Sequence, residues 1–132
     1  MSAPDLTELL ARVGADLGFL TPLEPGGWPD APTAVAAVDA RPPGRQRLVI
    51  ALGPGVAEAI AANMGASASA DEIASEVANV VAGHLFPALP GSGSGFLPPV
   101  DLGTRTHPPD VATGVRFAEG DIGLAVLEAV PG

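Results

Sequence analysis

The sequence contains no cysteine and no lysine. Without cysteine the chain can form neither a disulfide bond nor a catalytic thiolate. All of its 6 basic residues are arginines, and they are outnumbered by 15 aspartates and glutamates, so the formal net charge is −9. A chain this acidic lacks the basic surface that nucleic acids and anionic lipids require, and we predict neither a nucleic-acid partner nor a membrane partner.

Aromatic residues make up only 4% of the 132 residues, whereas 47% are apolar and many of these are alanine. This composition predicts a tight core of small side chains in a single domain over residues 1–132. No apolar run is long enough to cross a membrane, and the first residues, MSAPDLTELL, have neither the basic nor the apolar region of a signal peptide. We therefore expect the protein to be cytoplasmic.

The segment Asp71–Leu85, DEIASEVANVVAGHL, predicts the central helix of the chain. Apolar residues recur in it at helical spacing, and the stripe that would face the core consists of Ile73, Val77, Val80, Val81 and Leu85. A second line, turned by about 120° from this stripe, consists of Glu72, Glu76, Asn79 and Gly83. Ser69 and Glu72 match a capping box, which predicts that the helix begins directly after Ser69. Because Glu76 and Asn79 are three residues apart, we expect their side chains to project side by side from a rigid support.

Glycine and proline divide the rest of the chain into short segments. Helices are predicted over Asp5–Leu17 and Pro54–Met64. Strands are predicted over Thr33–Asp39, Arg47–Leu52, Phe96–Leu102, Val111–Ala118 and Ile122–Val130. This order predicts an α+β fold, in which an antiparallel β-sheet packs against helices.

Details of the connections follow from the same signals. Thr21–Pro32 is turn-rich and is expected to be irregular, so residues 1–32 would comprise a helix followed by an irregular segment. Phe96–Leu102 is expected at a sheet edge because Pro98 and Pro99 cannot donate ladder hydrogen bonds. The last two strands would be joined by a three-residue loop, Glu119-Gly120-Asp121.

Other notable residues allow more than one interpretation. Arg41, Arg45 and Arg47 form a basic cluster at the connection between the first two strands. They could grip an anion, although a charge run this short is more often a solvated loop. Trp28 is expected to pack over the core rather than to serve as a ligand platform.

Most kinds of catalytic chemistry find no support in the sequence. It has no phosphate-binding glycine loop and no turn that marks a nucleophile. His84 and His107 have no ligand spacing to each other or to acids, so we predict no metal site. Glu76 and Asn79 remain as a candidate pair, for which a plain solvated helix face is the competing interpretation. Asparagine is a poor helix former, so its presence inside a helix favours a functional role over a plain solvated face.

The run from Ser75 to Gly83, SEVANVVAG, resembles the signature helix of the CheC/CheX/FliY family of chemotaxis phosphatases. The resemblance extends over residues 46–130, through VAEAIAANMG before this helix, FLPPVDLG after it, and the closing VRFAEGDIGLAVLEAV. The CheX branch is the most similar, because it has a single E-x-x-N pattern. In this chain Glu8 is followed three residues later by Ala11, so the first helix carries no second pattern.

The resemblance implies a CheC-like fold and a phosphatase that hydrolyses the aspartyl phosphate of a CheY-type response regulator. By this resemblance Asn79 would orient the attacking water, and Glu76 would pair with the lysine beside the phosphoaspartate. Glu72 and Gly83 would face the partner, with Gly83 leaving room for its backbone. The regulator would supply Mg²⁺, so no cofactor is expected in this chain, and a homodimer paired through its sheets is expected. The alternatives are a non-catalytic module that binds receiver domains and a pure dimerisation domain.

Overall fold

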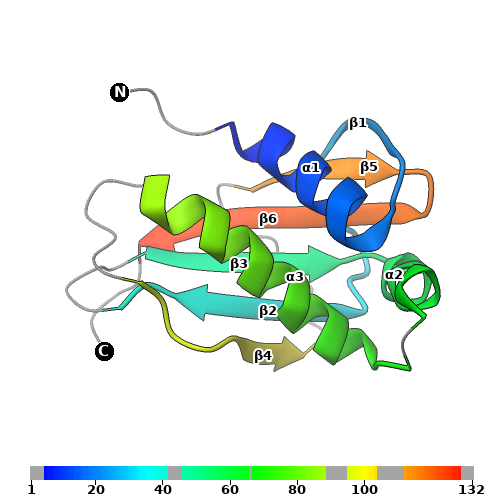
Figure 1. Ribbon diagram of the computed structural model, residues 1–132. Helices are drawn as coiled ribbons and strands as arrows, with labels where there is room; N and C mark the ends of the chain where they lie inside the picture. The colour runs from blue at the N-terminus through cyan, green and yellow to red at the C-terminus, as the bar shows by residue number, and fades with distance from the viewer. Residues whose placement is uncertain (1–4, 42–45, 66, 89–94, 104–111, 129–132) are drawn as a thin grey trace.

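The computed structural model describes residues 5–41, 46–65, 67–88, 95–103 and 112–128. Its strands form a six-stranded antiparallel sheet in the order β1-β5-β6-β3-β2-β4. Figure 1 shows helices α1 and α3 lying across one face of this sheet, with α2 at one end. The predicted α+β class is confirmed.

The bounds of the elements in chain order are α1 Leu6–Gly18, β1 Pro22–Gly26, β2 Ala34–Asp39, β3 Gln46–Leu52, α2 Val56–Met64, α3 Ala70–Leu85, the 3-10 turn η1 Phe86–Ala88, β4 Val100–Gly103, β5 Thr113–Phe117 and β6 Gly120–Glu128. The three predicted helices are therefore present with ends shifted by at most two residues. In α1, Asp5 is the N-cap and not part of the first turn, since its carboxylate accepts a hydrogen bond from the Glu8 N–H at 3.1 Å.

The core is built from small residues, as the composition predicts. The buried face of α3 alternates alanines with larger apolar residues, and it consists of Ile73, Ala74, Val77, Ala78, Val81, Ala82 and Leu85. The facing strand β2 has the sequence AVAAVD, of which the first five residues are buried. Small side chains on both surfaces allow the helix to lie close to the sheet, because side-chain size sets the separation of packed layers.

Helix α2 begins two residues later than predicted, and its predicted apolar side is buried except at its C-terminal end. Gly55 precedes it with φ 87° and Gly65 ends it with φ 65°, both in the left-handed region that favours glycine. Val56 and Ile60 are buried as expected, but Met64, the last residue of the helix, is 42% exposed.

The prediction that Thr21–Pro32 is wholly irregular is wrong. Pro22–Gly26 forms β1, which pairs with β5 at one edge of the sheet. Its two prolines are compatible with this place, because an edge strand leaves one row of backbone groups without ladder partners. The glycines and prolines of this segment, which are typical of turns, are the reason that the sequence did not predict the edge strand.

The last hairpin also differs from the prediction. Phe117 pairs with Gly120, so Ala118 and Glu119 alone form the turn and the following strand starts at Gly120. Gly120 adopts φ 146°, and a Cβ there would lie 2.7 Å from the Pro54 carbonyl oxygen. The glycine is thus needed inside the strand, where α2 approaches, and not as the tip of a three-residue loop.

The predicted edge strand Phe96–Leu102 is only partly formed. Phe96 makes a single bridge with Ala40, and the continuous strand β4 starts at Val100. The two prolines between these points interrupt the ladder, because they have no N–H to donate. The edge position itself is as predicted, because among the described strands β4 pairs with β2 alone.

The face of the sheet opposite the helices carries a row of very small residues. Each residue of this row pairs with the next on the neighbouring strand: Gly26 of β1 with Gly114 of β5, Gly114 with Gly123 of β6, and Gly123 with Ala51 of β3. A Cβ at Gly114 would overlap the Gly27 carbonyl oxygen and lie 2.7 Å from that of Ile122. One at Gly123 would lie 2.8 Å from Pro29 Cδ. We call Gly26, Gly114 and Gly123 the glycine row; it lets the chain after β1 cross close to the sheet.

Trp28 lies in this crossing segment and packs on the same face. It contacts a second buried cluster, which consists of Val35, Ala37, Val49 and Ala51. Trp28 therefore has the packing role that was predicted, on the sheet face that the helices leave uncovered.

Candidate functional site

The N-terminus of α3 is fixed by the predicted capping box. The Glu72 N–H donates to Ser69 Oγ at 3.2 Å, and the Ser69 N–H donates to Glu72 Oε1 at 3.2 Å. Asp71 and Glu72 in the first turn also interact favourably with the helix dipole. The Glu72 carboxylate, predicted to face a partner, therefore caps the N-terminus of its own helix.

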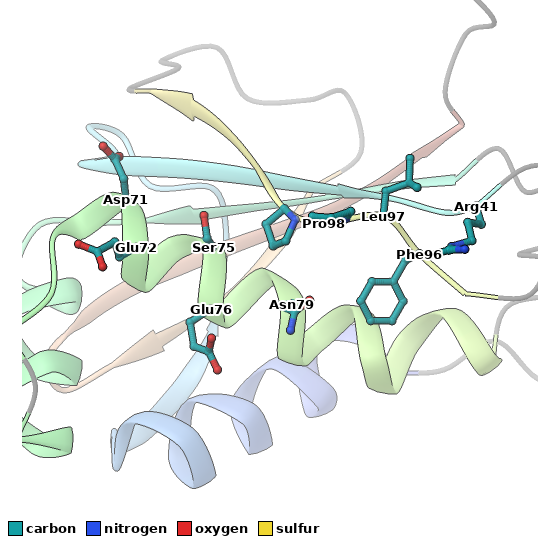
Figure 2. Close-up of a pocket in the computed structure, with 10 residues that line it drawn as sticks. Arg41, Asp71, Glu72, Ser75, Glu76, Asn79, Phe96, Leu97 and Pro98 are labelled. Atoms are coloured by element: carbon teal, nitrogen blue, oxygen red, sulfur yellow. The ribbon is translucent and has the colours of Figure 1, made fainter.

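Glu76 and Asn79 lie where the sequence places them. Both residues are exposed on the outer face of α3, while Val77 and Val81 between and beyond them are buried. Figure 2 shows the two side chains on neighbouring turns of the helix. In the part of the chain that the structure describes, no hydrogen bond or ion pair engages either side chain. The carboxylate and the amide are therefore free to meet a partner.

The pair opens onto a hollow of about 640 Å³, which we call the α3 hollow. Its lining consists of Asp71, Glu72, Ser75, Glu76 and Asn79 from α3, Phe96, Leu97, Pro98 and Pro99 opposite, and Arg41. One wall is thus polar and acidic, and the other is apolar. A mixed surface of this kind suits a protein partner that places polar groups on α3 and an apolar contact beside them.

The apolar wall is held against the end of β2 by backbone hydrogen bonds. The Leu97 N–H donates to the Asp39 carbonyl at 2.8 Å, and the Arg41 N–H donates to the Gly95 carbonyl at 2.9 Å. The Phe96 ring packs on the Phe86 ring at a centroid distance of 5.9 Å. Sequence reasoning expected a strand here but did not place it beside Asn79, because that contact spans the unpredictable connection after α3.

Gly83 is exposed one turn beyond Asn79, outside the lining of the hollow. A Cβ added there would meet only Phe96 Cζ, at 4.0 Å. The fold itself therefore does not require glycine at this position. That Gly83 leaves room for the backbone of a partner remains a prediction. That Glu72 faces the partner also remains a prediction.

The predicted arginine cluster is divided by the fold. Arg47 donates from Nε to Asp39 Oδ1 at 2.6 Å and from Nη2 to Asp39 Oδ2 at 2.9 Å, and this hydrogen bonding raises the pKa of Arg47. Arg45 lies outside the described residues, as does His107. Arg41 points toward Phe96 at one end of the α3 hollow (Figure 2).

Other candidate chemistry receives no support from the described residues. Glu8, the start of the missing second pattern, forms an exposed ion pair with Arg12 at 3.5 Å. No group of histidine, aspartate and glutamate within the described ranges could hold a metal ion. Within the same ranges, none of the helices has the length and apolar character needed to span a membrane.

Comparison with known proteins shows which solved structures share this fold. No family model matches the chain, and no curated protein does either. The chemotaxis protein CheX from Desulfovibrio desulfuricans superposes with a TM-score of 0.66 at 16% identity, covering 92% of this chain and 94% of that chain. CheX from Vibrio vulnificus has a TM-score of 0.64 at 18% identity, with coverages of 90% and 93%. A chain of the CheX–CheY–BeF3–Mg²⁺ complex from Borrelia burgdorferi has a TM-score of 0.62 at 17% identity, with coverages of 93% and 94%.

The molecule therefore has the fold of the CheX and CheC-like chemotaxis proteins. This confirms, at the level of the fold, the resemblance that the sequence of α3 and its neighbours carries.

Proposed function

We propose that this protein is a CheX-like phosphatase that hydrolyses the aspartyl phosphate of a CheY-type response regulator in the cytoplasm. It would thereby shorten the signal in chemotaxis or a related two-component pathway. The observation that carries this proposal is the pair Glu76 and Asn79, exposed and unengaged on one face of α3 at an open hollow. Support comes from the fold, since one protein with this fold is known in a complex with CheY, BeF3 and Mg²⁺.

The chemistry of the pair suits this reaction. Phosphoryl transfer is accelerated mainly by positioning and by charge neutralisation, so an enzyme needs no covalent nucleophile. The Asn79 amide has both an acceptor and two donors, with which it can hold a water in line with the phosphorus atom. The Glu76 carboxylate can form a charge-assisted hydrogen bond with a lysine of the regulator. The regulator's own Mg²⁺ would neutralise charge on the phosphoryl oxygens.

A direct experiment tests the function. Receiver domains from the same organism are phosphorylated with labelled acetyl phosphate, and loss of label is followed with and without this protein. We expect faster loss from at least one regulator. If no cognate regulator loses label faster, the enzyme proposal fails, and binding without acceleration would establish the non-catalytic docking module in its place.

Glu76→Gln is expected to weaken docking rather than to stop the chemistry. The substitution removes the charge but keeps the shape, so the affinity for a lysine-bearing partner should fall by about tenfold, the effect of one charge-assisted hydrogen bond. The concentration of regulator needed for half-maximal rate measures this effect. Glu58→Gln, an exposed first-turn glutamate of α2, is the matched control. A fall in maximal rate at saturating regulator would contradict this role.

We also propose a homodimer paired through β4. This strand is one edge of the sheet, and Val100 on it is 46% exposed, whereas the other edge, β1, carries two prolines that hinder pairing. Light scattering should give the dimer mass, and Val100→Arg should shift it to the monomer. Leu23→Arg, at the exposed position on β1, should not. A monomer mass for the wild type at high concentration would refute the dimer.

A further inference from the structure

Arg41 differs from the other arginines that the structure describes. Those arginines are paired with carboxylates: Arg12 with Glu8, Arg47 with Asp39, and Arg116 with Glu24 and Asp121. Arg41 is exposed, and within the described chain no ion pair or side-chain hydrogen bond engages it. In a chain with a net charge of −9, an unpaired cation at a candidate site is an unexpected feature.

The backbone of Arg41 is nevertheless well fixed. Its N–H donates to the Gly95 carbonyl at 2.9 Å, and the preceding Ala40 forms the bridge with Phe96. The guanidinium group is therefore carried by an anchored backbone at the end of β2, while its own donors remain open. This is the arrangement expected of a side chain that is positioned to bind a ligand.

The α3 hollow is polarised along its length. The carboxylates of Asp71, Glu72 and Glu76 lie toward the N-terminal end of α3, whereas Arg41 lies at the other end beside Phe96, and Asn79 lies between them (Figure 2). A phosphoryl anion that approached Asn79 would be repelled by the three carboxylates, since like charges within a Debye length raise the energy. A cation on the far side of Asn79 offsets this repulsion where the phosphoryl group would sit.

We propose that Arg41 binds the phosphoryl group of the docked phosphoaspartate and so makes the site selective for the phosphorylated form of the regulator. The inference rests on the docked partner of the proposed function. The partner's lysine would point to the acidic end and its phosphoryl oxygens to Arg41. Guanidinium suits this task because its planar fork of donors matches two oxygens of a phosphoryl group. Arg41 would thus bind substrate, with Asn79 acting on the water.

The test compares the affinity of the protein for receiver domains with Mg²⁺ alone and with Mg²⁺ plus beryllofluoride, which mimics the aspartyl phosphate. Wild type should prefer the beryllofluoride form. Arg41→Gln should lose about tenfold in affinity for this form and less than about twofold for the unmodified form. Arg41→Lys should lose less than Arg41→Gln, because it keeps the charge without the fork. Arg12→Gln, which removes an exposed arginine elsewhere, is the matched control and should bind both forms as wild type does.

Each outcome decides the proposal. If Arg41→Gln and Arg12→Gln bind the beryllofluoride form equally well, Arg41 does not hold the phosphoryl group, and the phosphatase activity of the wild type is judged separately by phosphate release. Equal loss for both forms of the receiver domain would also overturn the inference, because it would indicate general charge attraction. A wild type that binds but does not dephosphorylate ends the enzyme proposal alone. A wild type that binds neither form overturns both.

Discussion

Asn79→Ala is expected to reduce the acceleration of aspartyl-phosphate hydrolysis by at least about a hundredfold, the usual cost of losing a preorganised donor at a reacting centre. The defect should persist at saturating regulator, because a group that orients water acts in the transition state and not in ground-state binding. This distinguishes it from Glu76→Gln, whose effect should disappear at saturation. The measurement is single-turnover release of labelled phosphate over a range of receiver concentrations.

The fold should survive this substitution. Asn79 is exposed and, within the described residues, makes no hydrogen bond that alanine would forfeit. Alanine is also the better helix former by about 0.6 kcal/mol. Thermal unfolding should therefore show an unchanged or slightly raised Tm. Asn79→Gln tests geometry, since it retains the amide but displaces it by one methylene. His84→Ala, an exposed position near the end of α3, controls for unspecific change in the helix. Equal rates for wild type and Asn79→Ala would remove Asn79 from the mechanism.

Gly114→Ala is expected to have the largest effect on stability. A Cβ at this position would overlap the Gly27 carbonyl oxygen and lie 2.7 Å from that of Ile122, and both oxygens belong to the backbone. Neither can rotate away as a flexible side chain could, so the crossing segment with Trp28 must lift from the sheet. We expect the free energy of unfolding to fall by about 3 kcal/mol, the upper part of the range for overpacking. For a domain of this size, this lowers Tm by about 10 °C.

Gly27→Ala is the matched control for this prediction. Gly27 lies in the same crossing segment, but a Cβ there would meet no heavy atom within 4 Å. It should change stability by less than about 0.5 kcal/mol. Denaturant unfolding of the two variants beside the wild type measures the difference. Similar stabilities for the two variants would mean that the chain after β1 does not pack on the glycine row.

The parts of the structure that sequence could predict are those encoded locally. The apolar stripe of α3 and its capping box both lie within the span from Ser69 to Leu85, so periodicity and cap chemistry fix the helix and its outer face. The exposure of Glu76 and Asn79 could be predicted from that outer face alone. The side-by-side placement of the candidate pair was therefore available before any tertiary contact was known.

The missed features depend on contacts between distant residues. Strand β1 exists because it pairs with β5, about ninety positions later in the chain, and its own residues are typical of turns. The wall of the α3 hollow is set by hydrogen bonds between Gly95 or Leu97 and the end of β2. Arg41 consequently looked like part of a loop charge run, and only the tertiary structure places it near Asn79.

The isolation of Glu76 and Asn79 from the rest of the molecule also has an evolutionary consequence. Their side chains take no part in the core or in the capping box, and within the described residues no hydrogen bond or ion pair engages them. Selection for a folded protein therefore constrains them little, and a substitution by another good helix former at either position would pass without a folding defect. Relatives that depend on phosphate removal should keep both residues, whereas those that have given up the reaction are free to drift there while α3 keeps its inner face. Among relatives, the residues on the outer face of α3 would then vary with the activity, independently of the residues that maintain the fold.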